Sequence, residues 1–323
     1  MRVDHDRPRL CAVPRVAVAP PIAGPDGPCR ARRFARHLGV AIRGYYLGCP
    51  GWGVKTWVGR LFPTATRPTE FLERYARVFN AVEGNTTFYA LPAAETVERW
   101  RDQVPAGFRF CFKFPREISH DRLLIDCAAE VAAFIDRVAP LGDRLGTLFL
   151  QLPPRFDGTQ LPRLHAFLAA LPPGFDYAVE LRHEVFFRDG RVQTEVLELL
   201  RERGVDLVTM DARGLHAGKS LALAEVRARK PDLPVIVRTT ADRPIVRCVP
   251  HEQFDAARPF VEPWAAQIAR WIAAGKRPYF FMHAPDDTFA PENAYAFHAM
   301  VRRHADVGEL PPWPGGPRQL SLL

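Results

Sequence analysis

Short apolar segments alternate strictly with segments of helical periodicity from Tyr45 onward, and this alternation is the feature that most restricts the fold. Between the apolar segments, apolar residues recur with a period near 3.6, as in 71–79, 131–138 and 261–272. Alternating strands and helices produce parallel strands joined by helical crossovers. The expected strands are 45–49, 81–85, 108–113, 147–151, 177–182, 206–211, 235–239 and 279–283.

Eight such units favour a closed barrel over an open doubly wound sheet. No G-x-G-x-x-G turn follows the first expected strand. The helix-to-strand links are short, with glycines where left-handed residues end helices, whereas the links 50–68, 114–124 and 284–291 are long. We therefore predict an α/β fold, a single-domain TIM-type (β/α)8 barrel over residues 44–308. In such a barrel the loops at the carboxyl ends of the strands form the active face.

The two ends of the chain differ from this central part. Residues 1–43 carry nine arginines and three aspartates, which gives +6 of the total net charge of +8 and leaves +2 for residues 44–323. We expect 1–43 to be a disordered Arg/Pro-rich extension that either binds acidic partners loosely or reflects a misassigned start codon. Residues 309–323 are expected to form a flexible Pro/Gly-rich tail. The weak charge of 44–323 makes direct contact with duplex DNA unfavourable.

The compartment is expected to be the cytoplasm. No apolar run approaches the roughly 20 residues that cross a bilayer, and the first 43 residues lack the pattern of a secretory signal. The six cysteines include no C-x-x-C pair and are expected to be reduced. No membrane partner is predicted.

Ionisable or amide side chains end nearly every expected strand on one parity. Because side chains alternate faces along a strand, these residues should meet at one mouth of the barrel. A buried charge is costly unless it is paired, so the repetition of that cost at one end of seven strands indicates a site. The residues concerned are Glu83, Asn85, Lys113, Gln151, Glu180, Arg182, Asp211, Arg238 and His283.

Within this set we predict a catalytic group. Glu83 and Glu180 are candidates for an acid/base pair, although they could instead neutralise Lys113 and Arg182 in a structural network. Lys113 could form a Schiff base if it is desolvated, or bind an anion as a cation. The candidate catalytic residues are Glu83, Lys113, Glu180, Asp211 and His283.

The remaining candidates are expected to hold the substrate. The aromatic members can stack on a ligand or wall the pocket, and His183 has the outward parity of a loop residue. The inward charges are mixed and slightly cationic, which suits a small molecule that carries phosphate or carboxylate. The candidate substrate-binding residues are Trp52, Asn85, Phe88, Tyr89, His120, Gln151, Arg182, His183 and Arg238.

No cofactor is predicted. A divalent metal stays open as an alternative, with ligands from His120, His183 and His283 together with Glu83 and Asp211. No H-x-H or H-E-x-x-H spacing supports it.

Five segments together resemble the YecE-like family, a domain of unknown function, over about residues 45–305. They are LGCPGW at 47–52 with WVG at 57–59, VEGNTTFYALP at 82–92, FKF at 112–114 with ISH at 118–120, QLPPRF at 151–156, and VELRH at 179–183. The resemblance implies the same barrel, with these residues lining its cleft, and it implies no reaction. The chain departs mildly from the family pattern at Gly84 and Thr86. Its last expected strand, with His283, resembles a histidine-containing subgroup.

The final residues suggest a partner. Gln319, Leu320, Ser321, Leu322 and Leu323 follow a Pro/Gly-rich linker and resemble the peptide with which bacterial replication and repair proteins bind the DNA sliding clamp. A flexible tether would present one amide and spaced apolar anchors to a preformed groove. The alternative is a chance match of five residues.

Three hypotheses for function follow. The first is an enzyme acting on a small anionic metabolite through carboxylate acid/base chemistry, as a hydrolase, lyase or isomerase. The second is a DNA-maintenance protein that its tail recruits to the clamp. The third is a non-catalytic binding barrel.

Overall fold

Parallel strands form the centre of the structure, a computed structural model that describes residues 42–188 and 190–314. Six strands form one sheet in the order β1-β8-β7-β6-β5-β4, and β2 pairs with β3 in a second sheet. Every strand pair within these sheets is parallel. The strands are β1 (Tyr46–Gly48), β2 (Ala81–Gly84), β3 (Arg109–Phe112), β4 (Leu148–Gln151), β5 (Tyr177–Glu180), β6 (Asp206–Asp211), β7 (Ile245–Cys248) and β8 (Tyr279–Met282).

The fold is therefore α/β with parallel sheets, but one closed barrel sheet is not confirmed. The ladders between β1 and β2 and between β3 and β4 are reduced to isolated parallel bridges, among them Pro50 with Glu83 and Lys113 with Phe149. Since β1 has only three residues, little of its backbone is available to pair with two neighbours.

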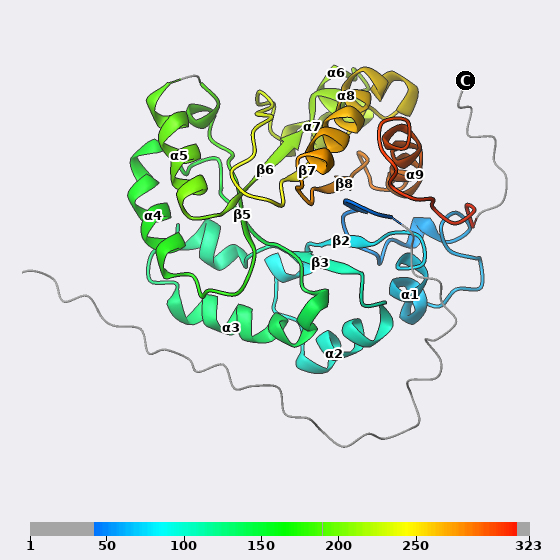
Figure 1. Cartoon of the computed structure of the whole chain (residues 1–323), viewed down its shortest axis with the longest axis horizontal. Coiled ribbons are helices and arrows are strands. Elements are labelled where there is room, and N and C mark those ends of the chain that lie inside the picture. The colour runs from blue at the N-terminus through cyan, green and yellow to red at the C-terminus, as the bar shows by residue number, and fades with distance from the viewer. Residues whose placement is uncertain (1–41, 189, 315–323) are drawn as a thin grey trace, which may run out of the picture. The chain divides into compact units, whose positions relative to one another are not determined.

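Helices follow the strands and lie outside them. In Figure 1, α2, α3, α4 and α5 follow one another along the outer side of β2 to β5, and α8 and α9 accompany β7 and β8. In the described ranges no helix is long and apolar enough to cross a membrane. The helices are α1 (Phe71–Tyr75), α2 (Ala94–Gln103), α3 (Ala128–Val138), α4 (Leu161–Ala170), α5 (Arg191–Glu202), α6 (Arg213–Ala217), α7 (Ala224–Arg229), α8 (Phe254–Ala273) and α9 (Ala290–Val301).

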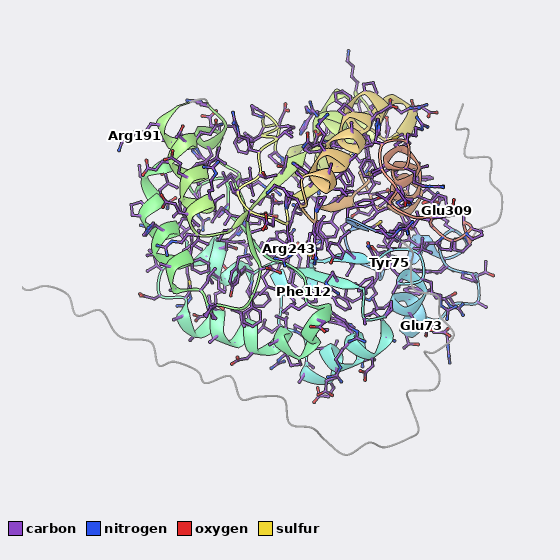
Figure 2. All side chains as sticks on the ribbon, in the orientation of Figure 1. Glu73, Tyr75, Phe112, Arg191, Arg243 and Glu309 are labelled. Carbon is purple, nitrogen blue, oxygen red and sulfur yellow. The ribbon has the colours of Figure 1, made fainter. Side chains whose placement is uncertain are left out.

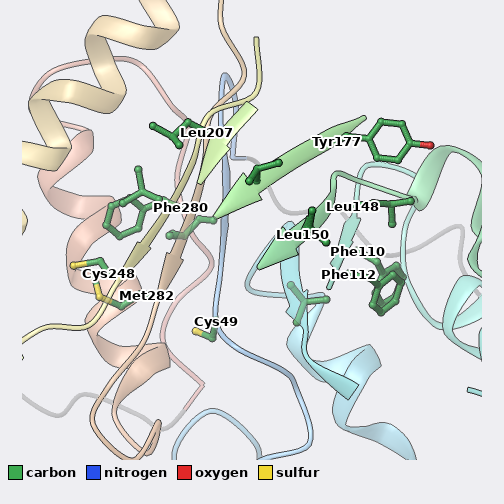
Figure 3. Close-up of a cluster of buried hydrophobic side chains, with 14 of the residues drawn as sticks. Cys49, Phe110, Phe112, Leu148, Leu150, Tyr177, Leu207, Cys248, Phe280 and Met282 are labelled. Atoms are coloured by element: carbon green, nitrogen blue, oxygen red, sulfur yellow. The ribbon is translucent and has the colours of Figure 1, made fainter. Parts of the chain in front are cut away.

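The period-two pattern of the strands produces two apolar clusters. The outer cluster fills the space toward the helices, and Figure 3 shows Phe110, Leu148 and Phe280 among its members. Charged side chains such as Arg191 and Glu309 lie at the periphery instead (Figure 2). The inner cluster takes residues of the opposite parity, at least one from each strand from β2 to β8. They are Ala81, Cys111, Phe149, Ala178, Val208, Ile245, Tyr279 and Phe281.

Glycines mark several helix-to-strand links, as their lack of a Cβ allows. Gly142, Gly174, Gly204 and Gly275 have positive φ, from 54° to 90°, in the left-handed region that favours glycine. Gly107, in the corresponding position before β3, does not have this conformation.

The seventh strand lies elsewhere than predicted. Residues 235–239 are not a strand, and β7 is Ile245–Cys248. Both segments are β-branched runs with one arginine, and both lie between α7 and α8, so the alternation of elements fits either. The earlier run follows Pro234 and pairs with no strand in the described chain. Its Ile236 carbonyl instead accepts a hydrogen bond from Thr209 Oγ1 at 3.0 Å.

Candidate functional site

Arg247 is the centre of a buried ion network at the carboxyl ends of the strands. It leaves β7 on the inner parity, and its guanidinium contacts two fully buried carboxylates. Nε and Nη2 donate to the two oxygens of Glu83 at 2.8 and 2.7 Å, and Nη1 donates to Glu180 Oε2 at 2.6 Å. Only 2% of Arg247 is exposed. The network therefore joins β2, β5 and β7.

Both carboxylates are held in the ionised form. Burial alone would raise the pKa of Glu83, but Arg247 and then His283 hold it well below its usual range. For Glu180, burial also opposes ionisation, while Arg182 and Arg247 lower the pKa to about 2. Permanently charged acceptors of this kind fix the positions of the cations around them.

Amide side chains extend the network toward the mouth. Arg182 ion-pairs with Glu180 and donates to Gln151 Oε1 at 3.3 Å. On the other side, Asn85 Nδ2 donates to Glu83 Oε1 at 2.9 Å. The Oδ1 atom of Asn85 is buried and has no hydrogen-bond partner among the described residues. This oxygen therefore takes no part in the hydrogen bonds of the ion network.

Lys113 follows β3 and stands beside this network without a hydrogen bond from its Nζ to any described residue. Nζ lies 3.8 Å from Glu83 Oε1, and it sits 5.6 and 5.8 Å from the ring centres of Phe149 and Phe88. Burial and the nearby charge of Arg247 lower its pKa to about 7, although Glu83 opposes the shift. Lys113 is thus an amine that is partly neutral near physiological pH.

His283 is the histidine of the site and follows β8. Its Nε2 lies 3.2 Å from Glu83 Oε2, and its Nδ1 lies 3.8 Å from Asp287 Oδ1. Burial lowers the pKa of His283, so the neutral ring is favoured. Since ionised Glu83 can only accept, we assign the proton to Nε2, which leaves Nδ1 as an acceptor.

These groups surround a cleft of about 270 Å³ at the carboxyl ends of the strands. Asp287 adopts a positive φ of 61° at its edge, and its backbone carbonyl is fixed by Trp57 Nε1 at 2.8 Å. The aromatic side is formed by Phe88 and the exposed Tyr89, whose rings meet edge to face. The residues lining the cleft are Pro50, Asn85, Phe88, Tyr89, Lys113, Gln151, Lys230, Arg247, His283 and Asp287.

Comparison with known proteins identifies the family of this chain. A family model described as "Protein of unknown function DUF72" matches residues 46–317. The chain belongs to the DUF72 family. The UPF0759 protein YecE of Escherichia coli K12 is 40% identical to it over 280 residues, which cover 86% of this chain and 99% of YecE.

Solved DUF72 structures share the fold. A DUF72 protein from Thermotoga maritima is 23% identical with a TM-score of 0.59, covering 80% of this chain and 99% of that one. One from Enterococcus faecalis is 16% identical with a TM-score of 0.62, covering 85% and 99%. At these identities the likeness concerns the fold alone.

In this DUF72 chain, many of the residues predicted from sequence come together. The cleft and the network beneath it contain Glu83, Asn85, Phe88, Tyr89, Lys113, Gln151, Glu180, Arg182 and His283. Their roles stay predictions.

Other candidates lie apart from the cleft lining. Trp52 packs edge to face on Trp100 of α2, with ring centres 5.1 Å apart, because its side chain turns to the outer apolar cluster. His183 accepts from the Val185 backbone at 3.1 Å and so caps a local turn. His120 contacts Phe88 edge to face, with ring centres 5.0 Å apart. Arg238 is exposed in the segment that is not a strand.

Asp211 points away from the site, contrary to prediction. On β6 the inner parity belongs to Val208, which is in the inner cluster, so Asp211 faces outward. Its Oδ2 accepts from Trp264 Nε1 of α8 at 2.8 Å and from Arg213 Nη2 at 2.8 Å. Asp211 therefore ties β6 to α8.

This placement predicts that Asp211→Asn changes stability and not ligand binding at the cleft. The amide replaces one acceptor by a donor, which must face the Trp264 or Arg213 donors. We expect a loss of about 1–3 kcal/mol in the free energy of unfolding, measured in urea. An unchanged stability, or a changed affinity at the cleft, would contradict this assignment.

Three important groups were missed by sequence reasoning. Arg247 is the arginine of the seventh strand, where Arg238 was predicted. The sequence feature that could have indicated it is an arginine within a run of β-branched residues. Lys230 lies just after α7 and not at the end of an expected strand, so strand parity does not select it. Asp287 lies in the long link 284–291, has a positive φ and lines the cleft.

Within residues 42–188 and 190–314, no group of three or more His, Cys, Asp or Glu side chains could hold a metal ion. Glu83, the predicted ligand nearest His283, has both oxygens engaged by Arg247. The predicted clamp-binding residues Gln319, Leu320, Leu322 and Leu323 lie outside the described residues.

Proposed function

We propose that this chain is an enzyme acting on a small anionic molecule, bearing carboxylate or phosphate, in the cleft at the carboxyl ends of the strands. The observation that carries the proposal is a pair of lysines, Lys113 and Lys230, that line one small cleft. Neither Nζ has a hydrogen bond to a described residue. An anion would provide both with a charge-assisted partner.

The charge balance supports this ligand class. Arg247 and Arg182 offset Glu83 and Glu180 within the buried network. Beyond the network, Asp287 is the carboxylate that lines the cleft, against two lysines. Burial and the charge of Arg247 lower the pKa of Lys230 as well as that of Lys113, as expected where cations are crowded. A bound anion would relieve this repulsion.

The ligand also needs a hydrogen-bond donor. Asn85 lines the cleft, and a ligand hydroxyl that reaches its buried, unpartnered Oδ1 would satisfy this acceptor. Phe88 and Tyr89 offer an apolar side for a carbon skeleton. A volume of about 270 Å³ suits a small metabolite rather than a dinucleotide.

The acid/base work is assigned to Lys113 and His283 rather than to the two glutamates. Glu83 and Glu180 are fully buried, do not line the cleft and are kept ionised by Arg247, so they have no proton to donate at neutral pH. Lys113 changes its charge near neutral pH and lines the cleft. General acids and bases act best when their pKa lies near the working pH.

We further propose that the two sheets close into one barrel of (β/α)8 type. Support comes from the bridges of Pro50 with Glu83 and of Lys113 with Phe149, which link β1 to β2 and β3 to β4. The inner cluster, drawn from seven strands, is the arrangement a barrel interior would have. The cleft would then occupy the face where such barrels carry their sites.

Anion affinity should fall as pH rises through 7. A bound anion favours protonated Lys113, whose pKa in the free protein is about 7. Below pH 7 Lys113 already carries its positive charge. Above pH 7 Lys113 must take up a proton when the anion binds, so the affinity falls by up to about ten-fold per pH unit. Calorimetry with inorganic sulfate, whose charge is constant over pH 6–9, measures this.

Lys230→Met and Lys219→Met form a matched pair for the same titration. Lys230 lines the cleft and Lys219 is exposed elsewhere. Loss of one charge-assisted hydrogen bond, about 1.5–3 kcal/mol, should weaken sulfate binding about ten-fold or more in Lys230→Met only. Equal affinities in the two variants, or no saturable binding of sulfate or phosphate, would remove the proposal.

A further inference from the structure

The sequence contains five lysines, at 55, 113, 219, 230 and 276, among 44 lysines and arginines. Arginine is thus the usual cation of this chain, yet two of the five lysines line the cleft. Arginine stays charged at all physiological pH values and cannot act as an amine nucleophile. Lysine at positions 113 and 230 therefore provides a property that the prevailing residue lacks.

Of the two, Lys113 has the surroundings of a reactive amine. It is 8% exposed, and its Nζ has no hydrogen bond to a described residue, so its lone pair is not engaged when it is neutral. Its Nζ lies over the rings of both Phe149 and Phe88, which keeps the amine poorly solvated. Desolvation beside other cations is how enzymes activate a lysine for attack on a carbonyl.

We propose that Lys113 condenses with an aldehyde or ketone that carries a carboxylate or phosphate, forming a Schiff base in the cleft. This inference rests on the proposed function and adds to it the carbonyl group and the covalent step. Lys230 would hold the anionic group. His283 Nδ1, the free acceptor of the ring, would handle the proton.

The step balances with water as the only by-product. The lone pair of neutral Lys113 forms a bond to the carbonyl carbon while the π electrons of C=O move to oxygen. His283 Nδ1 takes a proton from the nitrogen and returns it to the oxygen, giving a carbinolamine. A further proton from solvent lets the hydroxyl leave as water, and the nitrogen lone pair forms the C=N bond of a cationic iminium.

The network explains why the cation formed is tolerated. Glu83 Oε1 is 3.8 Å from Nζ and stays ionised, so it stabilises a positive nitrogen whether that nitrogen is an ammonium or an iminium. Because a protonated imine is a stronger acid than the parent ammonium, the nearby carboxylate is needed to keep the nitrogen charged. An electron-withdrawing iminium would then assist bond cleavage next to the former carbonyl carbon, as in lyases and isomerases.

Reductive trapping tests the proposal. The full chain is incubated at pH 7 with sodium cyanoborohydride and one of four probes, and intact mass and peptide mapping are measured. The probes are pyruvate, glyoxylate, glyceraldehyde 3-phosphate and the uncharged glycolaldehyde. We expect one adduct, of the probe's mass less one oxygen, on Lys113, and formed about ten-fold faster with an anionic probe than with glycolaldehyde, the gain of one charge-assisted contact.

The variants separate reaction from binding. Lys113→Met and Lys113→Arg should both lose the adduct. Lys113→Arg keeps a positive charge at this position, so its loss of the adduct would be due to the missing amine. Lys219→Met should react like the wild type. In Lys230→Met the adduct should still form on Lys113, but without the preference for anionic probes.

Each outcome distinguishes the two proposals. Sulfate binding that depends on Lys230 together with no adduct on Lys113 would overturn the Schiff base and leave the anion-binding enzyme intact. A Lys113 adduct that neither sulfate nor phosphate slows would support the condensation and remove the anion site. Labelling spread evenly over the five lysines would overturn the Schiff base, because no position would then be special.

Discussion

Arg247→Met should cost this protein about 3–5 kcal/mol of unfolding free energy at pH 7, the loss typical of removing one partner from a buried ion network. Methionine fills much of the arginine's volume, so the change is mainly electrostatic. It leaves Glu83 and Glu180 fully buried without the guanidinium that contacts both. Urea denaturation followed by circular dichroism measures the loss.

The loss should depend on pH in a stated direction. In the wild type, the folded pKa of both carboxyls lies below the unfolded value of about 4.3, so their contribution is present above that pH and lost as pH falls toward the folded value, about 2 for Glu180. In Arg247→Met, the effect of burial outweighs that of the remaining cations, so the pKa of both carboxyls rises. The difference between the proteins should therefore shrink as pH is lowered from 7 to 5.

Two further variants control this result. Arg188→Met removes an arginine from a pair with Glu184 in which both side chains are more than 60% exposed, and it should change stability by less than about 0.5 kcal/mol. Adding Glu180→Gln to Arg247→Met should recover part of the loss. A loss below about 1 kcal/mol would show that the carboxylates do not need Arg247, contrary to the geometry.

The sequence predicts much of the framework because the two periodicities are local properties. Strand parity places Glu83, Lys113, Glu180 and His283 at one end of the strands, and the structure brings them to one network and cleft. These four follow from counting by twos along each strand, because each lies two residues beyond a member of the inner cluster. The outward parity of His183 is obtained in the same way.

The failures occur where two local patterns compete and only tertiary contacts decide. On β6 the parity is ambiguous, because Thr209 and Asp211 alternate with Val208 and Met210. The indole of Trp264, more than 50 residues away, provides the partner that lets Asp211 face outward. Strand parity alone cannot supply that contact.

The exchange of Arg238 for Arg247 has a similar cause. Both arginines sit in β-branched runs between the same two helices. The run that forms β7 is the one whose arginine can satisfy two buried carboxylates. Partner choice across β2, β5 and β7 is a long-range property, so the sequence predicts a cation at this place without identifying which one.

Lys113→Met should have the opposite effect to Arg247→Met and stabilise the protein at pH 7. Lys113 is buried beside Arg247, and Glu83 keeps its bidentate contact with Arg247 when Lys113 is removed. The folded pKa of about 7, against about 10.4 in the unfolded chain, means that burial of Lys113 costs up to about 4 kcal/mol at pH 7, which an apolar side chain would avoid. A residue that weakens the fold where it stands is typical of a site selected for function.

The sign of the pH dependence identifies the cause of this gain. The folded pKa of Lys113 is about 7, below the unfolded value of about 10.4, so between these values the unfolded chain binds a proton that the folded one lacks. Wild-type stability should therefore rise with pH across this range relative to Lys113→Met, by up to about 1.4 kcal/mol per pH unit. The stability advantage of Lys113→Met over the wild type should be largest at and below pH 7 and shrink toward pH 10, whereas Lys219→Met should follow the wild type.

Urea unfolding at pH 7, 8 and 9 measures the stability of all three proteins. A Lys113→Met protein that is less stable than the wild type, or a difference that does not vary with pH, would mean that this amine remains an ordinary charged lysine, and neither its reactivity nor its role in anion binding would then follow from the structure.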